Sequence, residues 1–312
     1  MDLIHYPDDA RPAAWADPVL ALGNFDGLHR GHMKIIERVH RAAAGRGVTP
    51  VVLTFDPHPT RVLRPDKAPR LILTEAQKIE ILEQAGMRGV AIVRFTAELS
   101  RWDPEVFVRV VLVEWLGVSE VWVGANFLFG RERSGTFAIL RELSSTYGFR
   151  ADKIDPICYK DVVVSSTRIR RLIAEGRVDE GAALLGHHYY IDGDVVAGDG
   201  RGRQLGFPTA NLRTVNELLP PHGVYATIAR VGADLYPAVT NLGVRPTFER
   251  AGGASIESHL LRGGRDLYGE RIRLYFVQRL RDERAFESVD ALTRQVDQDC
   301  RQVEALFGRI SV

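Results

Sequence analysis

The feature that most constrains the fold is a change of sequence pattern near residue 186. Before it, short apolar runs alternate with segments in which apolar residues recur at helical spacing. After it, strand-like runs follow one another with glycine-rich turns between them, and a helical pattern returns only at residue 288. Because domains usually hold about 100–200 residues, we expect the 312 residues to form two domains, 1–186 and 187–312.

The first part predicts an α/β domain. Its strand candidates are near-continuous apolar runs, which are typical of strands buried on both faces. Thr74 and Gln77 form a capping-box signal at the start of one helix, and Asp103 with Pro104 marks the start of another. This alternation indicates a Rossmann-like parallel sheet with helices on both faces. The predicted strands are 19–22, 51–55, 90–95 and 120–123, and the predicted helices begin after Gly31, Thr74 and Asp103 and at 167 and 178.

The second part predicts a small antiparallel β-barrel. Its runs are rich in β-branched and aromatic residues, and turns such as 231–234 and 262–265 join them. From residue 288 onward one apolar stripe at helical spacing predicts a helix that closes the domain. The predicted strands are 189–196, 223–231, 235–240, 256–261 and 271–280, and strand 271–280 precedes the closing helix.

Charge and cysteine content exclude several classes of protein. The chain has 41 basic and 40 acidic residues; residues 1–185 hold 25 basic and 24 acidic residues, and the remainder holds 16 of each. Neither part has the basic excess expected of a partner for nucleic acid or an anionic membrane. Cys158 and Cys300 lie too far apart for a disulfide scaffold. The start lacks a signal-peptide pattern, and charges at Arg109 and Glu114 interrupt the longest apolar stretch, so we expect a cytoplasmic protein.

The segment GNFDGLHRGH, residues 23–32, follows the first predicted strand and leads into a helix. Gly23 and Gly27 allow a tight turn close to a ligand, and a helix N-terminus attracts anions. His29 and His32 can then donate hydrogen bonds to phosphate oxygens. An ordinary strand–turn–helix with two incidental histidines is the alternative, and a zinc site lacks convincing further ligands.

A second polar segment, SSTRIR at 165–170, opens a later helix. Hydroxyl side chains at a helix start, with Arg168 one turn in, also suit a phosphate. Alone the segment is equally consistent with simple N-capping. The two segments together indicate a triphosphate site, although the chain has no Walker A sequence.

The segment GDGRGRQLGFPTANL, residues 198–212, is the corresponding feature of the second part. Glycine loops that expose backbone N–H groups bind anions. Thr209 and Asn211 share one face of a strand, where their oxygens can meet Mg²⁺. Since the last lysine is Lys160, arginine, backbone N–H groups and Mg²⁺ must neutralise phosphate here. Glu257 is a candidate base; the alternatives are a purely geometric hairpin loop and a solvated strand glutamate.

Several motifs resemble a known family, the prokaryotic bifunctional riboflavin kinase/FAD synthetases. The resemblance covers about residues 18–307. The first set is similar to the FMN adenylyltransferase module, and the second set, in order, to the riboflavin kinase module. The first set is GNFDGLHRGH, TFDPHP (54–59), GANFLFG (124–130) and SSTRIR. The second set is GRGRQLGFPTANL, GVYA (223–226), TNLGVRPTF (240–248), IESHLL (256–261) and LYGERIRLYFVQRLR (267–281).

The resemblance implies that the second domain phosphorylates riboflavin with Mg·ATP and that the first adenylylates the FMN to FAD. It implies catalytic roles for Glu257 in the kinase and for His29, His32 and Arg168 in the adenylyltransferase. The implied adenylyltransferase ATP site is Gly23, Phe25, Asp26, Gly27, His29, His32, Ser165, Ser166, Thr167 and Arg168. The implied FMN site is Asp56, His58, Asn126 and Arg170. The implied kinase ATP site is Gly202, Arg203, Gly206, Phe207, Pro208, Thr209 and Asn211, with Thr209 and Asn211 also as metal ligands.

One position departs from the family pattern, and three other functions stay open on the residues alone. Leu128 stands where many relatives carry a polar residue, so adenylylation of FMN could be weaker here. The alternatives are a nucleotidyltransferase for another phosphate such as nicotinamide mononucleotide, a flavin-storage protein and a nucleic-acid-binding barrel. The expected partners are riboflavin, FMN, FAD and ATP, with neither nucleic acid nor membrane, and no oligomeric state is predicted.

Overall fold

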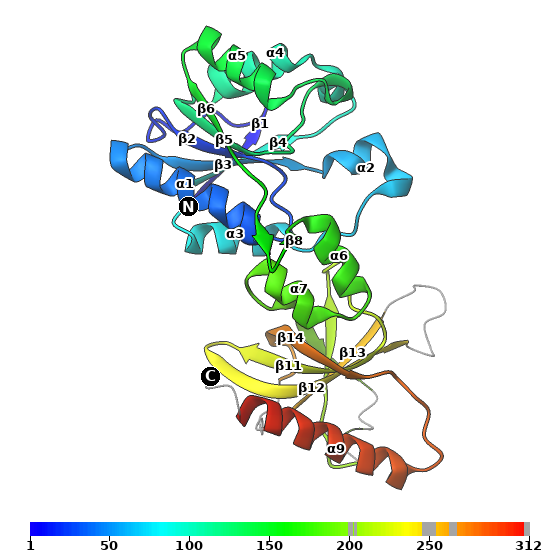
Figure 1. The fold of residues 1–312 in the computed structure, drawn as a ribbon. Coiled ribbons are helices and arrows are strands. Elements are labelled where there is room, and N and C mark those ends of the chain that lie inside the picture. Colours follow the sequence, from blue (N-terminus) through cyan, green and yellow to red (C-terminus); the bar gives the residue numbers. More distant parts are fainter. Residues whose placement is uncertain (199–201, 203–204, 245–253, 262–266, 309–312) are drawn as a thin grey trace. The chain divides into compact units, whose positions relative to one another are not determined.

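The computed structural model describes residues 1–198, 202, 205–244, 254–261 and 267–308. The chain divides into two compact units, Met1–Ser166 and Thr167–Val312 (Figure 1). The division precedes the expected boundary at 186, because helix α7 (Val178–Leu185) packs against the strands of the second unit. Helix α6 (Ser166–Ala174) begins at the division itself. Both helices had been predicted, at 167–175 and 178–185.

The first unit is built on a parallel sheet of six strands in the order β1-β4-β3-β2-β5-β6. The four strands predicted from apolar runs are confirmed. The two edge strands escaped prediction because exposed and charged residues interrupt their apolar residues. The strands are β1 (Asp2–Tyr6), β2 (Val19–Leu22), β3 (Pro50–Asp56), β4 (Gly89–Arg94), β5 (Glu120–Gly124) and β6 (Arg150–Ile154).

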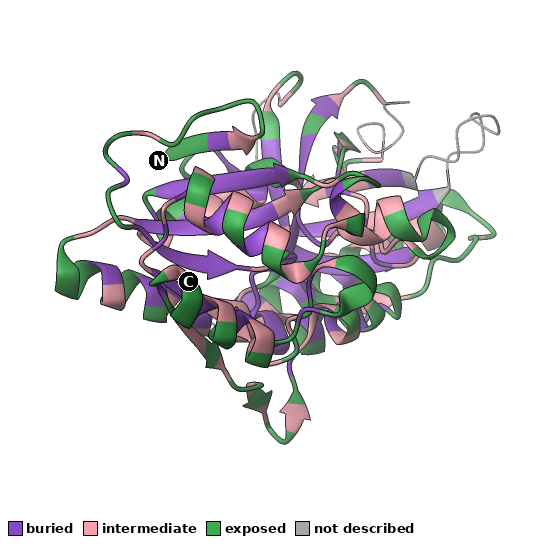
Figure 2. Cartoon of the chain, turned by 90° about the horizontal axis from the view of Figure 1, so that it is seen from above, coloured by how far each residue is buried: buried purple, intermediate pink, exposed green. Residues whose placement is uncertain are grey.

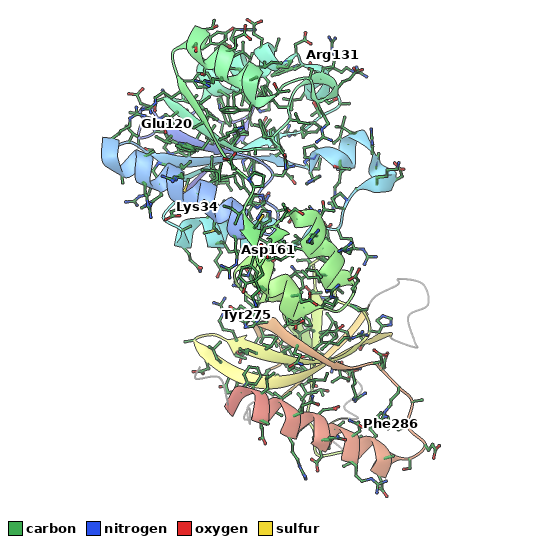
Figure 3. The ribbon with its side chains drawn as sticks, viewed as in Figure 1. Lys34, Glu120, Arg131, Asp161, Tyr275 and Phe286 are labelled. Atoms are coloured by element: carbon green, nitrogen blue, oxygen red, sulfur yellow. The ribbon has the colours of Figure 1, made fainter. Side chains whose placement is uncertain are left out.

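Helices cover both faces of this sheet, as predicted: α1 and α3 lie on one side and α4 and α5 on the other (Figure 1). The predicted capping box of Thr74 and Gln77 is present. Asp103 occupies the N-cap position but makes no capping hydrogen bond. Its carboxylate pairs instead, at 3.1 Å, with Arg131, which is labelled in Figure 3. The helices are α1 (Arg30–Arg46), α2 (Pro59–Leu63), η1 (Pro65–Lys67), α3 (Glu75–Gln84), η2 (Leu99–Arg101), α4 (Pro104–Phe107), η3 (Val108–Trp115), η4 (Arg131–Arg133) and α5 (Phe137–Tyr147).

The second unit contains a closed antiparallel barrel in the order β10-β13-β12-β11-β14-β9, which confirms the predicted architecture. Tyr189, Tyr225 and Phe276 are fully buried and pack ring against ring. The predicted turn at 262–265 lies outside the described residues. The strands are β9 (Tyr189–Val196), β10 (Ala210–Thr214), β11 (Gly223–Val231), β12 (Asp234–Val244), β13 (Ala254–Leu260) and β14 (Arg271–Arg281); a small hairpin, β7 (Cys158–Tyr159) and β8 (Val162–Val163), belongs to the first unit.

The predicted closing helix is α9 (Val289–Gly308), which covers part of the outer surface of the barrel. Its Val303 and Phe307 pack against Val224 and other apolar residues of β11, β12 and β14. Figure 2 shows the strands largely buried, whereas the helices combine buried and exposed faces. In the described part of the chain, none of the helices is long and apolar enough to cross a membrane.

Candidate active sites

The first candidate site lies at the carboxyl ends of the central strands of the parallel sheet. From β2 the chain proceeds to β3 and β4 on one side and later to β5 and β6 on the other. Such a reversal point is where open α/β sheets bind ligands. His29 follows β2, Asp56 ends β3 and Asn126 follows β5, so three predicted site residues come from adjacent strands.

The turn between β2 and α1 has an unusual backbone. Phe25, Gly27 and Leu28 have φ angles of +49°, +87° and +41°. A left-handed conformation costs about 1–2 kcal/mol for a residue other than glycine, so the surroundings must hold Phe25 and Leu28 in place. Both side chains are fully buried. The turn is therefore anchored by packing as well as by its glycine.

Asp26 anchors the same turn through its carboxylate. It accepts hydrogen bonds from the backbone N–H of Ile72, at 3.0 and 3.2 Å, and of Leu73, at 3.2 Å. Only 3% of Asp26 is exposed. The family resemblance implies a place for Asp26 among the residues around ATP, and the structure shows its carboxylate bonded to a loop 46 residues further along the chain.

His29 and His32 form a stacked pair at the N-terminus of α1. Nδ1 of His29 accepts from the backbone N–H of His32 at 3.2 Å, and the ring centroids lie 3.6 Å apart with an interplanar angle of 14°. Phe25 meets the ring of His32 edge-on at 5.2 Å. A Cβ at Gly31 would lie 3.2 Å from the His29 ring. The spacing of the two histidines thus brings both imidazoles together at the helix N-terminus, where an anion is favoured.

The second predicted phosphate segment meets this turn through Ser166. Its hydroxyl donates to the backbone oxygen of Asp26 at 2.8 Å, which joins segments 140 residues apart. Arg168 and Arg170 lie in the first turns of α6 and belong to the second unit, as does Thr167. Their contribution to the same site stays a prediction, and so does that of Ser165.

Aromatic residues gather at the same end of the sheet, where the strands terminate. The sequence patterns did not reveal this feature. Adjacent rings of this aromatic cluster have centroids 5.5 to 6.1 Å apart. Asn126 and Leu128 flank one of the rings and are exposed. Nδ1 of His58, a predicted FMN ligand, accepts from the backbone N–H of Thr60 at 3.2 Å and so caps α2. The members of the cluster are Phe55, Phe95, Phe107, Phe127 and Phe129.

The second candidate site is a polar row across three strands of the barrel. Glu257 on β13 lies opposite Asn211 on β10 and opposite Asn241 on β12. Asn241 in turn pairs with Val224, which packs under α9, so the row faces outward. The hydroxyl of Ser255 donates to Oε1 of Glu257 at 3.2 Å. Asn241 was not predicted, because only strand pairing reveals that it neighbours Glu257.

Glycines allow the preceding loop to approach this row closely. A Cβ at Gly198 would lie 2.1 Å from Nδ2 of Asn211, and one at Gly202 would lie 2.5 Å from the backbone oxygen of Phe207. The Phe207 N–H donates to the Gly202 oxygen at 2.8 Å. Gly206 has a φ of +84°. Arg203 lies outside the described residues.

His259 anchors the end of that loop on β13. Its Nδ1 lies 2.9 Å from the backbone oxygen of Pro208, and its ring meets Phe207 edge-on at 5.6 Å. His259 was missed as a site residue. Its spacing of two from Glu257 is the available signal, because residues i and i+2 of a strand share a face.

Together these arrangements define a class: a two-module protein with a candidate anion site on an α/β unit and a carboxylate–amide row on a barrel. Residues 11–168 match the family model for FAD synthetase, and residues 185–307 match that for riboflavin kinase. The bifunctional riboflavin kinase/FMN adenylyltransferase of Bacillus subtilis (strain 168) is 35% identical over 300 residues, which are 95% of this chain and 94% of that protein. The enzyme of the same description from Escherichia coli (strain K12) is 35% identical over 93% of each chain.

A solved structure described as a macrolide-efflux protein from Streptococcus pneumoniae is also similar. It has a TM-score of 0.88 and 28% identity and covers 97% of this chain and 99% of its own. The role in that description is a statement about that protein alone. The two family models and the curated relatives place this chain in the family of bifunctional riboflavin kinase/FMN adenylyltransferases. The resemblance drawn from the motifs is confirmed.

Proposed function

We propose that this chain carries out the two reactions of its family at the two sites described above. The barrel phosphorylates riboflavin to FMN, and the α/β unit transfers AMP from ATP to FMN, releasing pyrophosphate and forming FAD. ATP is the co-substrate of both reactions. The observation that carries the proposal is the match of two different family models, each to the part of the chain that holds the corresponding site.

In the kinase site, Glu257 takes the proton from the primary alcohol of riboflavin. Thr209 and Asn211 offer a hydroxyl and an amide oxygen, the hard donors that Mg²⁺ accepts. The close approach of Gly198 to Asn211 makes a cradle that a larger residue would fill, which suits a nucleotide complex. Bound Mg²⁺ supplies neutralisation of phosphate charge. Gly202, Gly206, Phe207 and Pro208 would hold the phosphates of ATP, and the sequence adds Arg203, which lies outside the described residues, as a candidate cation.

In the adenylyltransferase site, the attacking phosphate of FMN is already ionised at neutral pH, so no general base is needed. His29, His32 and the N-terminus of α1 donate hydrogen bonds to the α-phosphate and the departing pyrophosphate. Donors fixed in advance stabilise charge that develops in the transition state. Ser165 and Ser166 extend this set of donors, while Gly23, Phe25, Asp26 and Gly27 shape the turn; for Thr167 and Arg168 the ATP-binding role is the one that the family motif implies.

The aromatic cluster supports a location for the flavin ring. Planar apolar rings pack favourably on aromatic side chains, and Phe55 and Phe127 are half-buried rather than enclosed. Asp56, His58 and Asn126 stand at the same sheet edge. We assign the polar ends of FMN to these three residues; for Arg170 the FMN-binding role is the one that the family motif implies.

Two further expectations complete the proposal. The functional boundary falls at 186/187, in keeping with a kinase match that begins at residue 185. The protein works in the cytoplasm, where ATP is available to both sites.

The test is a reaction of the purified protein with riboflavin, ATP and Mg²⁺, with FMN and FAD separated by chromatography over time. FMN followed by FAD supports both sites. Omission of Mg²⁺ in the presence of a chelator should abolish FMN formation if the metal assignment is right. Formation of FMN without FAD would contradict the adenylyltransferase half of the proposal. It would point to Leu128 as the departure from the family pattern that weakens the second reaction. If folded protein forms neither FMN nor FAD, the proposal is contradicted. That result would favour a nucleotidyltransferase that acts on another phosphate.

A further inference from the structure

Lys78 lies next to the strained turn of the first site, although none of the sequence motifs includes it. It is on α3, and its ammonium donates to the backbone oxygen of Asn24 at 3.1 Å and lies 3.4 Å from the hydroxyl of Thr54. The Thr54 hydroxyl itself donates to the same Asn24 oxygen at 3.1 Å. Two donors therefore converge on one carbonyl, directly before the left-handed residue Phe25.

The position of Lys78 on its helix is unfavourable on electrostatic grounds. It stands in the first turns of α3, whose N-terminus carries a partial positive charge that disfavours cations. Burial lowers the pKa of the Lys78 ammonium, the largest effect on it, whereas the carboxylates of Asp26, Asp56 and Glu75 act in the opposite direction. The contacts of the ammonium must therefore offset both the helix dipole and its partial removal from water.

We propose that Lys78 is a positioning residue of the adenylyl transfer, acting through the carbonyl oxygen of Asn24. By holding this oxygen together with Thr54, it fixes the start of the turn that leads to His29 and His32. Its charge also balances Asp26 and Asp56, two carboxylates that would otherwise repel a polyphosphate beside them. The inference rests on the proposed roles of the two histidines.

The main variant is Lys78→Met, which keeps the length of the side chain and removes its charge and donors. A displacement of about 1 Å in catalytic groups can cost on the order of 100-fold in rate. We expect kcat for FAD formation from supplied FMN to fall by about that factor, with a smaller change in KM for ATP, because the misplaced contacts act in the transition state. Lys78→Arg keeps the charge and the donors, so its kcat for FAD formation should be at least tenfold higher than that of Lys78→Met.

The chain supplies its own controls. Riboflavin kinase activity should not change in Lys78→Met, because the variant lies in the other unit. Lys153→Met removes an exposed lysine of β6, whose ammonium lies over the ring of Phe137, and FAD formation should stay within about twofold. All four tryptophans, at 15, 102, 115 and 122, belong to the first unit, so their fluorescence reports whether that unit is folded.

A double-mutant cycle keeps the inference testable if Lys78→Met does not fold. Thr54→Val removes one donor to the Asn24 oxygen and Lys78→Gln removes the charge of the other, and their effects on kcat should be non-additive because both act through that oxygen. Additive effects, or a folded Lys78→Met with unchanged kcat, overturn the inference. His32→Ala separates the two levels of the argument: if it retains FAD formation, the proposed site itself is wrong. If it is inactive while Lys78→Met is active, only the role of Lys78 is wrong.

Discussion

The candidate phosphate site of the first unit stands at the carboxyl ends of a parallel sheet, whereas that of the second unit lies on the outer surface of a closed barrel. In the first, a strained turn is held by the buried carboxylate of Asp26 and by the Ser166 hydroxyl. In the second, glycines allow a loop to approach Asn211, and Glu257 lies on the neighbouring strand. In the proposed mechanism the first site therefore fixes hydrogen-bond donors in advance, and the second combines a base with Mg²⁺.

This difference follows from the nucleophile that each reaction uses. A phosphate attacks without losing a proton, so the first site needs stabilisation of charge and can rely on helix N–H groups and imidazoles. An alcohol must lose its proton, so the second site needs a carboxylate within reach. The most direct test of this difference is to remove the key group of one site and to measure both reactions.

The largest effect is expected from Glu257→Gln. Loss of a general base typically costs about 10²–10⁴-fold, so FMN formation should fall by that factor while FAD formation from supplied FMN continues. The measurement is the initial rate of each product. Glu287→Gln, the same change at an exposed residue before α9, should leave both rates unchanged. A Glu257→Gln enzyme with a normal kinase rate would show that the carboxylate is a solvated strand residue.

His32→Ala should have the next largest effect, on the opposite reaction. Removal of one donor to developing charge costs on the order of 10²–10³-fold in kcat, and FMN formation should be unaffected. His40→Ala serves as the matched control, since His40 lies further along the same helix. If His32→Ala lowers both activities equally in folded protein, the two sites do not act separately.

Gly198→Ala tests the cradle of the kinase site. A methyl group there would lie within 2.1 Å of the Asn211 amide, so Asn211 must move. We expect roughly a tenfold loss of kcat/KM for ATP in FMN formation, since small displacements of positioning groups have large effects. Gly308→Ala, with open space around its Cβ, is the control. An unaffected rate would exclude Asn211 from the ATP site.

Tyr225→Phe should have the smallest effect, on stability alone. The buried Tyr225 hydroxyl donates to the Pro221 oxygen at 2.6 Å, and this bond contributes about 1 kcal/mol. Burial raises the pKa of Tyr225 to about 12. The folded state therefore favours the neutral phenol, and this stabilisation is lost as pH rises from 10 to 12. Urea unfolding should show that the free energy of unfolding of the unaltered protein exceeds that of Tyr225→Phe by less as the pH rises over that range. Both activities should be unchanged at pH 8.

How much of the fold could be predicted depended on burial on both faces. Strands β2 to β5 of the first unit are continuous apolar runs because helices cover each side of the sheet. The edge strands β1 and β6 are half exposed, so their apolar residues do not form such runs. Helix α5 was also missed, although Thr136 caps it.

In the candidate sites, contacts between residues close in the sequence could be predicted, whereas contacts between distant residues could not. The turn and helix at 23–32 contain their own signals, because hydrogen bonds between nearby residues such as His29 and His32 are encoded locally. Contacts across long separations left no local trace. The bond from Ile72 to Asp26, the Lys78 contact with Asn24 and the pairing of Asn241 with Glu257 depend on which elements lie side by side.

By itself, then, the sequence determined the two-part architecture, the central strands, the motifs of both sites and the family. The tertiary structure decided which residues support those motifs: the carboxylate beneath the turn, the lysine beside it, the aromatic cluster and the row of Asn211, Glu257 and Asn241. The physical reason is the distance along the chain over which each effect acts. Periodicity, capping and turn chemistry act over a few residues, whereas strand order and register bring together residues tens of positions apart.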